Sequence, residues 1–414
     1  MLRTFAALLW YFRHVSILYN TFQHRNYTNI NITMKKILLS VCLMASAMLF
    51  ADNPSDVLRA YNRAGGGYVI INADNEVVGF SSEGQIEAND ASDLFFLGQQ
   101  IQIINAPEQA EQVLGFPAPV KDSVGPLLGD IAYNQGKPYH NMTPTIGNTH
   151  CLTGCVATAM AQIARYWQWP KTCNEGVVTY TPAKVGEPVT YTYTGHSFDW
   201  DNMKTQYTGI IADGGEYPET VAQQNAVADL MLACGVGVYM NYGTDGSGST
   251  STNVPKVFRQ YFNYMNDLEL HRVEDLNTQG TLMTGLIAEF DAGRPVYCDG
   301  YNNIDNQGDA FHAYVIDGYV TLQGDDNLTA PYFHFNFGWG GSKNGWYRIT
   351  GNRDRSDYSS LNVIFKLRPN APTGLMDAVE SLKDGKIRDI MGREVNETVS
   401  GQLYIQDGRK FIAR

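Results

Sequence analysis

The chain has 414 residues, of which 44% are hydrophobic and 17% charged, and it carries a formal net charge of −12. This composition is typical of a globular protein with enough apolar residues for a core, and it excludes a disordered chain. The acidic balance repels phosphate backbones, so we do not expect nucleic acid as a partner. The length is sufficient for two or three domains.

Residues 34–51 have the pattern of a secretory signal peptide. A basic start, Met-Lys-Lys, precedes an apolar run from Ile37 to Phe50 that contains small residues suited to cleavage. The run is shorter than the roughly 20 residues of a membrane span. We therefore expect residues 1–33 to be a mis-assigned start, translation to begin at Met34, and the protein to be secreted or held at the cell surface.

Residues 52–119 form a first module before the main body. The stretch "GGGYVIINADNEVVGFSSEG" predicts two short strands around a turn at Asp74-Asn75. Residues 90–116 are expected to be rich in helix, and the proline-punctuated stretch 117–123 to be an exposed connector.

The main body, residues 124–369, changes its periodicity midway. Its first half predicts helices from Cys155 to just before Pro170 and at about 217–233, 254–265 and 279–291, with strands over 177–194 and a Gly/Ser loop over 243–253. Its second half has the two-residue period of strands in "PVYC", "HAYVIDGY", "YFHFNFGW" and "WYRI". Helices followed by antiparallel strands predict an α+β fold with a cleft between the two halves.

Five cysteines remain after removal of the signal segment, and their spacing does not indicate a disulfide framework. They are Cys151, Cys155, Cys173, Cys234 and Cys298.

Cys155 is the best candidate for a nucleophile. It follows Gly154 where a loop enters a helix, so exposed amides and the helix dipole should lower its thiol pKa. Cys151 lies a turn earlier, still in the loop. Three alternatives remain open for this pair: ordinary buried cysteines, a disulfide bridge between the two, and a metal site with His150, although C-x3-C is not a usual zinc spacing.

A thiol nucleophile requires a base, and His312 is the candidate because it opens a predicted buried strand facing the cleft. His334 lies among aromatic residues and reads as a core histidine. Asn336 and Trp339 follow it, and an amide and an indole near the base could hold one imidazole tautomer and exclude water.

Four motifs, in order, resemble the streptopain family of papain-like cysteine proteases over about residues 125–367. They are "YNQGKPY", "GCVATAMAQIARYWQWP", "HAYVIDG" and "FHFNFGWGG…NGWYRI". The resemblance implies a two-lobed papain-like fold, with a helical lobe and an antiparallel β lobe, over residues 120–369. It also implies that residues 52–119 are an inhibitory α/β propeptide that covers the cleft until it is cut off.

The resemblance also implies roles for single residues. It makes Cys155 the nucleophile, His312 the base and Gln135 a donor to the oxyanion. By analogy with papain, Asn336 and Trp339 orient and shield the histidine. The activity implied is that of a secreted cysteine endopeptidase made as a zymogen, with no metal or cofactor.

Substrate-binding residues are expected in two places. The Gly/Ser loop with Gly246 and Ser247 resembles a wall of the substrate cleft. Phe311 stands where the family typically has glycine, and this ring could narrow the subsites. Phe337 stands where the family has tryptophan, so a polar contact of that indole with the histidine would be lost. These departures motivate a catalytically silent binding protein as one alternative; a thiol amidase or transpeptidase using the same dyad is another.

The expected partners are protein or peptide substrates and the chain's own propeptide. Residues 370–414 contain short strands separated by the turns "MGRE" and "DGRK", after the linker "RPNAPTG". This segment resembles C-terminal sorting or attachment tails, which predicts a link to the cell surface.

Overall fold

The computed structural model describes part of the chain between residues 57 and 412. The described ranges are 57–63, 65–72, 75–86, 100–104, 120–208, 218–278, 280–302, 310–322, 331–349, 362–371, 387–389, 395, 403–406 and 409–412. The chain divides into two units, Met1–Val57 and Leu58–Arg414. The expected signal segment, 34–51, lies outside the described residues. No described helix is long and apolar enough to cross a membrane.

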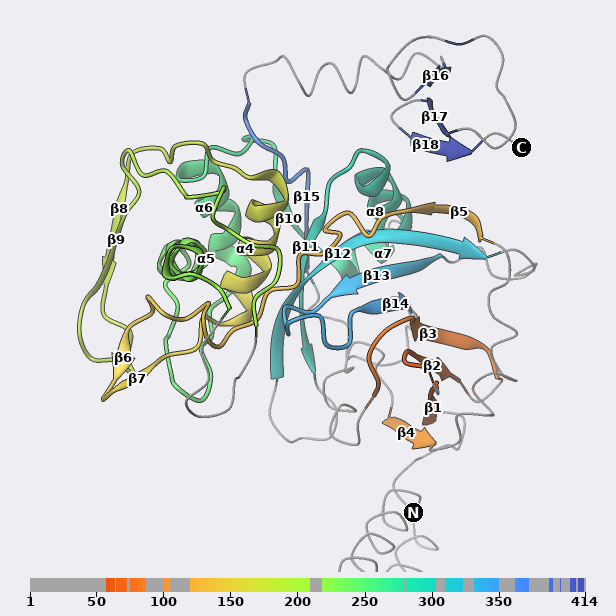
Figure 1. Cartoon of the computed structure of the whole chain (residues 1–414), viewed down its shortest axis with the longest axis horizontal. Helices are drawn as coiled ribbons and strands as arrows, with labels where there is room; N and C mark the ends of the chain where they lie inside the picture. The colour runs from red at the N-terminus through yellow and green to blue at the C-terminus, as the bar shows by residue number, and fades with distance from the viewer. Residues whose placement is uncertain are drawn as a thin grey trace, which may run out of the picture. The chain divides into compact units, whose positions relative to one another are not determined.

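An 11-stranded sheet, antiparallel in each pairing that the structure describes, organises the second unit (Figure 1). In spatial order its strands are β10 (Glu269–Arg272), β15 (Asn362–Phe365), β11 (Val296–Asn302), β12 (Ala310–Leu322), β13 (Tyr332–Asn336), β14 (Gly345–Arg348), β3 (Val77–Ser81), β2 (Tyr68–Ile71), β1 (Val57–Asn62) and β4 (Gln100–Ile104), with β5 (Val120–Val124) paired to β12.

Helices pack on this sheet or on one another, and three smaller sheets accompany it (Figure 1). The helices are α4 (Cys155–Trp167), α5 (Val221–Gly237), η4 (Ser251–Asn253), α6 (Val254–Gln260), α7 (Val273–Thr278) and α8 (Leu282–Asp291), and the remaining strands are β6 (Thr145–Ile146), β7 (Thr149–His150), β8 (Val177–Tyr180), β9 (Val189–Thr192), β16 (Ile387–Asp389), β17 (Leu403–Gln406) and β18 (Arg409–Ile412).

The central strands are buried on both faces. Ala313 and Val315 of β12 pack into the core around α4, α5 and α6, whereas Tyr314 and Ile316 pack into the core that contains α7 and α8. Successive side chains of a strand point to opposite faces, which explains the division. The sheet therefore separates two cores, and α4 lies directly on β12.

The order of helices and strands confirms the predicted α+β class, with local corrections. The helix predicted for 217–233 begins at Val221, where Thr220 and Gln223 form a capping box. The helix predicted for 254–265 ends at Gln260, because the chain turns through a left-handed φ of 52° at Asn263. The short helix α7 and the strands β10 and β15 were not predicted.

In the first module the predicted hairpin is confirmed as β2 and β3. The helix-rich prediction for 90–116 is wrong for β4, whose sequence QIQII alternates with the period of a strand; its other residues lie outside the described ranges. The connector predicted for 117–123 is exposed at 121–123, but from Val120 onward it is strand β5.

The C-terminal segment contains a three-stranded sheet of β16, β17 and β18. The strands β17 and β18 pair up to Gln406↔Arg409, on either side of the predicted turn "DGRK", whose Asp-Gly lies outside the described residues. The turn predicted at "MGRE" lies outside the described residues.

Candidate active site

The N-terminus of α4 is shaped by a glycine. Gly154 adopts a φ of 85°, which residues with a side chain rarely adopt. A Cβ at this position would also lie 2.7 Å from the Met240 side chain and 3.0 Å from the Ser247 carbonyl oxygen. The loop can therefore approach this closely only with glycine, and Cys155 becomes the first residue of the helix.

The Cys155 thiol lies against the start of β12. The backbone amides of Ala313, Val156 and Cys155 itself interact with it and lower its pKa, but burial has the larger effect and raises the pKa to about 11. The helix amides thus lower the thiol pKa, as predicted, but by less than burial raises it. Because Ala313 follows His312 in β12, this amide contact places the sulfur one residue along the backbone from the histidine.

His312 is buried and oriented by a backbone carbonyl. Its Nε2 lies 2.9 Å from the carbonyl oxygen of Phe337, and its ring stacks on Trp339 with centroids 4.5 Å apart. A carbonyl can only accept, so Nε2 carries the proton of the neutral ring and Nδ1 is its basic nitrogen. The structure therefore brings His312 and Trp339 together, and it places the Cys155 thiol at the backbone of Ala313, the residue after His312.

Asn336 does not make the contact expected of it. Its Nδ2 donates to the Ile131 carbonyl at 2.7 Å, and its Oδ1 accepts from the Gly338 amide at 3.2 Å. These two bonds hold the backbone on either side of Phe337, whose carbonyl contacts His312. Asn336 can thus orient the histidine only through its neighbour.

The Phe337 side chain is a core residue, and its amide donates to Asn344 Oδ1 at 3.1 Å. The hydrogen bond from position 337 to His312 is made by the backbone, and the Phe337 ring adds a stacked contact with centroids 6.3 Å apart. The loss of a tryptophan at this position therefore leaves the backbone hydrogen bond intact. No sequence pattern indicates a backbone carbonyl, so this group was missed.

Gln135 lies in the loop beside the nucleophile. Its carbonyl accepts from the amide of Thr153 at 3.1 Å, and its own amide binds Asn134 Oδ1 at 2.7 Å. Thr153 precedes Cys155 by two residues, so Gln135 is attached to the segment that delivers the thiol. Its side chain is half-buried.

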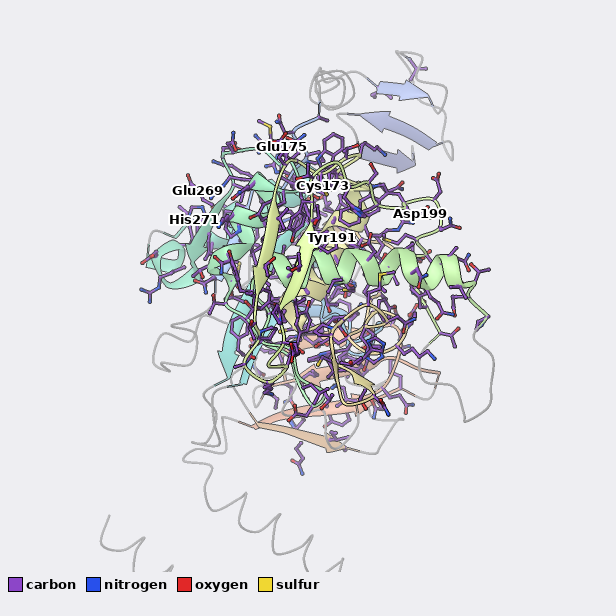
Figure 2. All side chains as sticks on the ribbon, turned by 90° about the vertical axis from the view of Figure 1, so that its left-hand side faces the viewer. Cys173, Glu175, Tyr191, Asp199, Glu269 and His271 are labelled. Carbon is purple, nitrogen blue, oxygen red and sulfur yellow. The ribbon has the colours of Figure 1, made fainter. Side chains whose placement is uncertain are left out.

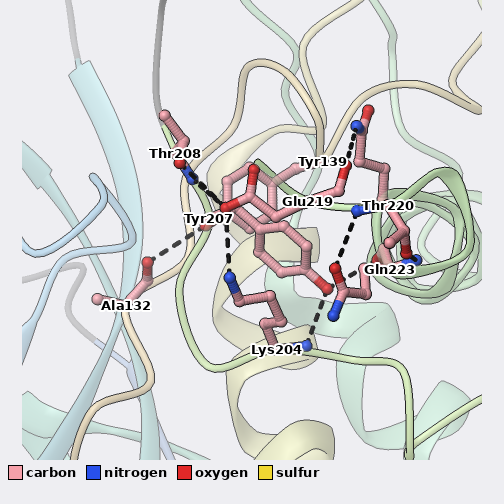
Figure 3. A network of polar contacts seen from close by, with 9 residues as sticks. Ala132, Tyr139, Lys204, Tyr207, Thr208, Glu219, Thr220 and Gln223 are labelled. Atoms are coloured by element: carbon pink, nitrogen blue, oxygen red, sulfur yellow. Dashed lines mark hydrogen bonds and ion pairs between the residues drawn. The ribbon is translucent and has the colours of Figure 1, made fainter. Parts of the chain in front are cut away.

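A polar network holds this loop in place (Figure 3). Tyr139 donates to the Ala132 carbonyl at 3.3 Å, and the Ala132 amide binds the carbonyl of Thr205 at 3.0 Å. The neighbouring Tyr207 donates to Gln223 in α5 at 2.8 Å. The loop that carries Gln135 is thereby tied to the helical lobe.

Ser247 braces the nucleophile loop. Its Oγ donates to the Leu152 carbonyl at 2.7 Å and accepts from the Gly243 amide at 2.9 Å. A Cβ at Gly246 would meet no atom within 4 Å, so this side of the loop faces open space. Phe311 is half-buried against the core of the helical lobe. A substrate-binding role for these residues stays a prediction.

The other cysteines are buried and unbridged. Burial raises the pKa of Cys151, and raises that of Cys173 to about 12 with a further contribution from Asp229. Figure 2 shows Cys173 next to Tyr191, and the two are electrostatically coupled. Within the described ranges no group of three His, Cys, Asp or Glu side chains could hold a metal ion. His150 instead contacts the Thr143 carbonyl at 2.7 Å.

His334 has the structural role predicted for it. Its Nδ1 lies 2.6 Å from Asp317 Oδ1, and the other carboxylate oxygen accepts from the Leu128 amide at 2.9 Å. The pair joins β13 to β12 and to the segment after β5. His334 is thus part of the framework.

Three comparisons place the chain among known proteins. A model of the peptidase C10 family matches residues 133–347. Streptopain of Streptococcus pyogenes is 28% identical over 314 residues, covering 70% of this chain and 73% of that protein. The thiol protease/hemagglutinin PrtT of Porphyromonas gingivalis is 28% identical over 340 residues, covering 73% of this chain and 36% of that protein.

A solved structure extends the similarity to the fold. A fragment of prointerpain A from Prevotella intermedia superimposes with a TM-score of 0.56 at 26% identity. The match covers 76% of this chain and 99% of the fragment. The chain therefore belongs to the peptidase C10 family and is a cysteine peptidase with a papain-like fold.

Proposed function

We propose that the chain is a secreted cysteine endopeptidase, made as a zymogen, whose catalytic pair is Cys155 and His312. The observation that carries this proposal is the contact of the Cys155 thiol with the Ala313 amide, one residue from a histidine held by the Phe337 carbonyl. A thiol at a helix N-terminus beside an oriented imidazole is the arrangement of a thiol nucleophile and its base.

In the proposed mechanism the proton of Cys155 passes to Nδ1 of His312, and the thiolate attacks the peptide carbonyl. The amide of Cys155 and the side chain of Gln135 bind the oxyanion. The imidazolium then protonates the leaving amine, and the neutral ring activates water to hydrolyse the thioester. Trp339 stacks on His312 and shields it from water.

Contacts of the first module, residues 52–119, with the catalytic domain support the proposal that the chain is made as a zymogen. β3 pairs with β14 (Trp346↔Phe80 and Tyr347↔Gly79), which extends the sheet of the catalytic domain. Ser81 Oγ donates to the Asn344 carbonyl at 2.9 Å and Tyr68 OH to the Lys343 carbonyl at 3.1 Å.

The turn reached by these two bonds also contacts the site. Lys343 Nζ lies 4.8 Å from the centroid of Trp339, and Asn344 Oδ1 binds the amide of Phe337. The module is thus connected to Trp339 and Phe337, which contact His312. In the described residues it pairs with the sheet edge, whereas we expected it to cover the cleft.

An affinity label tests the catalytic pair. An epoxide or chloromethyl ketone added in small excess near neutral pH should modify Cys155 alone. Cys155→Ala should remain unprocessed if maturation is self-catalysed, whereas the matched variant Cys151→Ala should mature and hydrolyse denatured casein. A label on Cys151, or activity in Cys155→Ala, would overturn the assignment. Labelling spread over several thiols would favour a silent scaffold, and product masses would reveal transfer to an acceptor other than water.

A second experiment tests whether residues 52–119 inhibit the enzyme before they are removed. A chain beginning at Val120 keeps β5 and its pairing with β12 but lacks residues 52–119. This chain should hydrolyse substrate at once, and a chain beginning at Asp52 should show a lag. Equal initial rates would remove the inhibitory role from this module.

Secretion through residues 34–51 and surface attachment through 370–414 complete the proposal. If the C-terminal segment is an address, truncation after Asn370 should leave turnover in vitro unchanged while the protein is lost from the cell surface. A large fall in turnover on truncation would instead indicate that the segment is part of the enzyme.

A further inference from the structure

Asp299 is a fully buried carboxyl in the centre of the sheet, beneath the nucleophile. It lies on β11 opposite Ala313 of β12 and Asn362 of β15. Its strand neighbour Tyr297 points into the core around α4, and a side chain two residues along a strand points to the same face. Asp299 therefore lies on the Cys155 side of the sheet, opposite the residue whose amide contacts the sulfur.

The hydrogen bonds of this carboxyl are concentrated on one oxygen. Oδ1 accepts from the amide and from Nδ2 of Asn362, at 3.1 and 2.7 Å. Oδ2 is buried and has no hydrogen-bond partner among the described residues. The Ser251 hydroxyl lies 2.6 Å from Tyr297 OH, and it also interacts with the Asp299 carboxyl and lowers its pKa. A buried polar atom without a partner is costly, and such groups concentrate at functional sites.

Three of the groups around Asp299 are weak acids, and none of its hydrogen-bond partners among the described residues carries a positive charge. Across from it on α4 lies the Cys155 thiol, and on β11 lie Tyr297 and Cys298; the pKa of each is raised by burial and also by Asp299. From β15 and η4 come the neutral side chains of Asn362 and Ser251. On β12, His312 is one residue from the opposing Ala313. In the described part of the chain no lysine or arginine forms an ion pair with Asp299.

We propose that Asp299 is a positioning residue of the catalytic pair, whose carboxylate restrains the ionisation of Cys155. This inference rests on the proposed role of Cys155 as the nucleophile. The thiol and the carboxyl share one buried region, and the imidazolium of His312 is the cation of the proposed pair. A second anion beside the sulfur opposes the thiolate.

The effect of Asp299 on Cys155 depends on which of the two groups ionises first as the pH rises. Burial raises the pKa of Asp299 from 3.8 to about 6, and that of Cys155 to about 11. The carboxyl loses its proton first, so above about pH 6 the thiol ionises beside a charge of its own sign. Below that pH the carboxyl is neutral and the restraint is absent.

The test compares the rate of Cys155 alkylation by iodoacetamide in the wild type and in Asp299→Asn, as a function of pH. The amide keeps an oxygen for Asn362 and removes the charge. The ratio of variant to wild-type rate should be near one at about pH 5, where neither side chain is charged. It should rise through pH 6 toward about tenfold, the effect of a like charge a few ångström away. Asp299→Ser removes the charge with a smaller side chain, should the first variant not fold.

Asp317→Asn is the matched control, because Asp317 is equally buried in the adjacent strand but pairs with His334. Its ratio should stay independent of pH. A pH-independent ratio for Asp299→Asn, or for Asp299→Ser if only that variant folds, would overturn the proposal, because a purely structural role predicts that result. Should neither fold, the wild-type profile decides: the logarithm of the Cys155 alkylation rate should rise less steeply with pH through about pH 6, where the carboxyl becomes charged, and a constant slope through this pH refutes the coupling. Peptide mapping distinguishes failure of this inference from failure of the proposed function. If the proposed function is wrong, the label lies on a cysteine other than Cys155.

Discussion

Two buried aspartates in or beside β12 differ in their hydrogen bonds: Asp317 lies in the second half of the strand, and Asp299 faces its start from β11. Asp317 uses both carboxylate oxygens, one for His334 and one for the amide of Leu128. At the start of β12, next to Cys155 and His312, the facing Asp299 leaves one oxygen without a partner among the described residues. Both aspartates are fully buried.

The difference separates a framework from a site. A carboxylate that is paired and hydrogen-bonded stabilises one arrangement of strands, and breaking such a pair destabilises the fold. A carboxyl whose hydrogen bonds are concentrated on one oxygen is available to respond to charge nearby. The half of β12 that holds Asp317 is therefore a fixed frame for the half that carries His312 and faces Asp299.

The largest effect should come from replacing each of two histidines, His312 and His334, by alanine. His312→Ala removes the proposed base, so kcat/KM should fall by about three to four orders of magnitude, with little change in Tm. His334→Ala should lower Tm first and leave the folded enzyme active. Casein hydrolysis and thermal unfolding of both variants measure this, and exchanged phenotypes would show that the base was chosen wrongly.

Asp317→Asn should give the next largest effect, on stability. Removing one partner of the buried pair with His334 costs about 3–5 kcal/mol of unfolding free energy. Urea unfolding near neutral pH measures the loss, and residual turnover per folded molecule should be unchanged. A variant as stable as the wild type would mean that the pair contributes nothing to the framework.

Asp299→Asn should change stability in a pH-dependent way. Since the carboxyl pKa is raised from 3.8 to about 6 on folding, the folded state holds this proton more tightly than the unfolded state. Its contribution is therefore fully present below about pH 4 and lost as pH rises through 6, up to about 3 kcal/mol. The variant should lack this fall. Urea unfolding at several pH values measures it, and parallel profiles for both proteins would contradict the expectation.

The smallest effect is expected at the rim of the site. Lys343 lies over the exposed side of the Trp339 stack, and a cation–π contact of this kind contributes about 0.5–1 kcal/mol. Lys343→Ala should therefore lower kcat/KM by less than about fivefold, with Lys343→Arg retaining the contact. A loss approaching that of His312→Ala would place Lys343 within the machinery.

Local patterns were enough to predict the elements that carry the site. The glycine before Cys155, the helical spacing of the apolar residues after it and Pro170 predicted α4, and the two-residue period predicted β12, β13 and β14. These signals lie within one element. The strands β5, β10 and β15 were missed because they are short, with four or five residues each, and pairing with a neighbour makes them strands.

The sequence by itself determined which residues could do the chemistry, because a thiol at a helix start and a histidine at a strand start have local signatures, and because four motifs resemble one family. Only the tertiary structure decided which groups surround them. The carbonyl of Phe337 and the carboxyl of Asp299 reach the site through strand register, between residues 25 positions apart in the case of His312 and Phe337. Burial, which sets the ionisation of Cys155 and Asp299, is a property of the packed sheet and helix together.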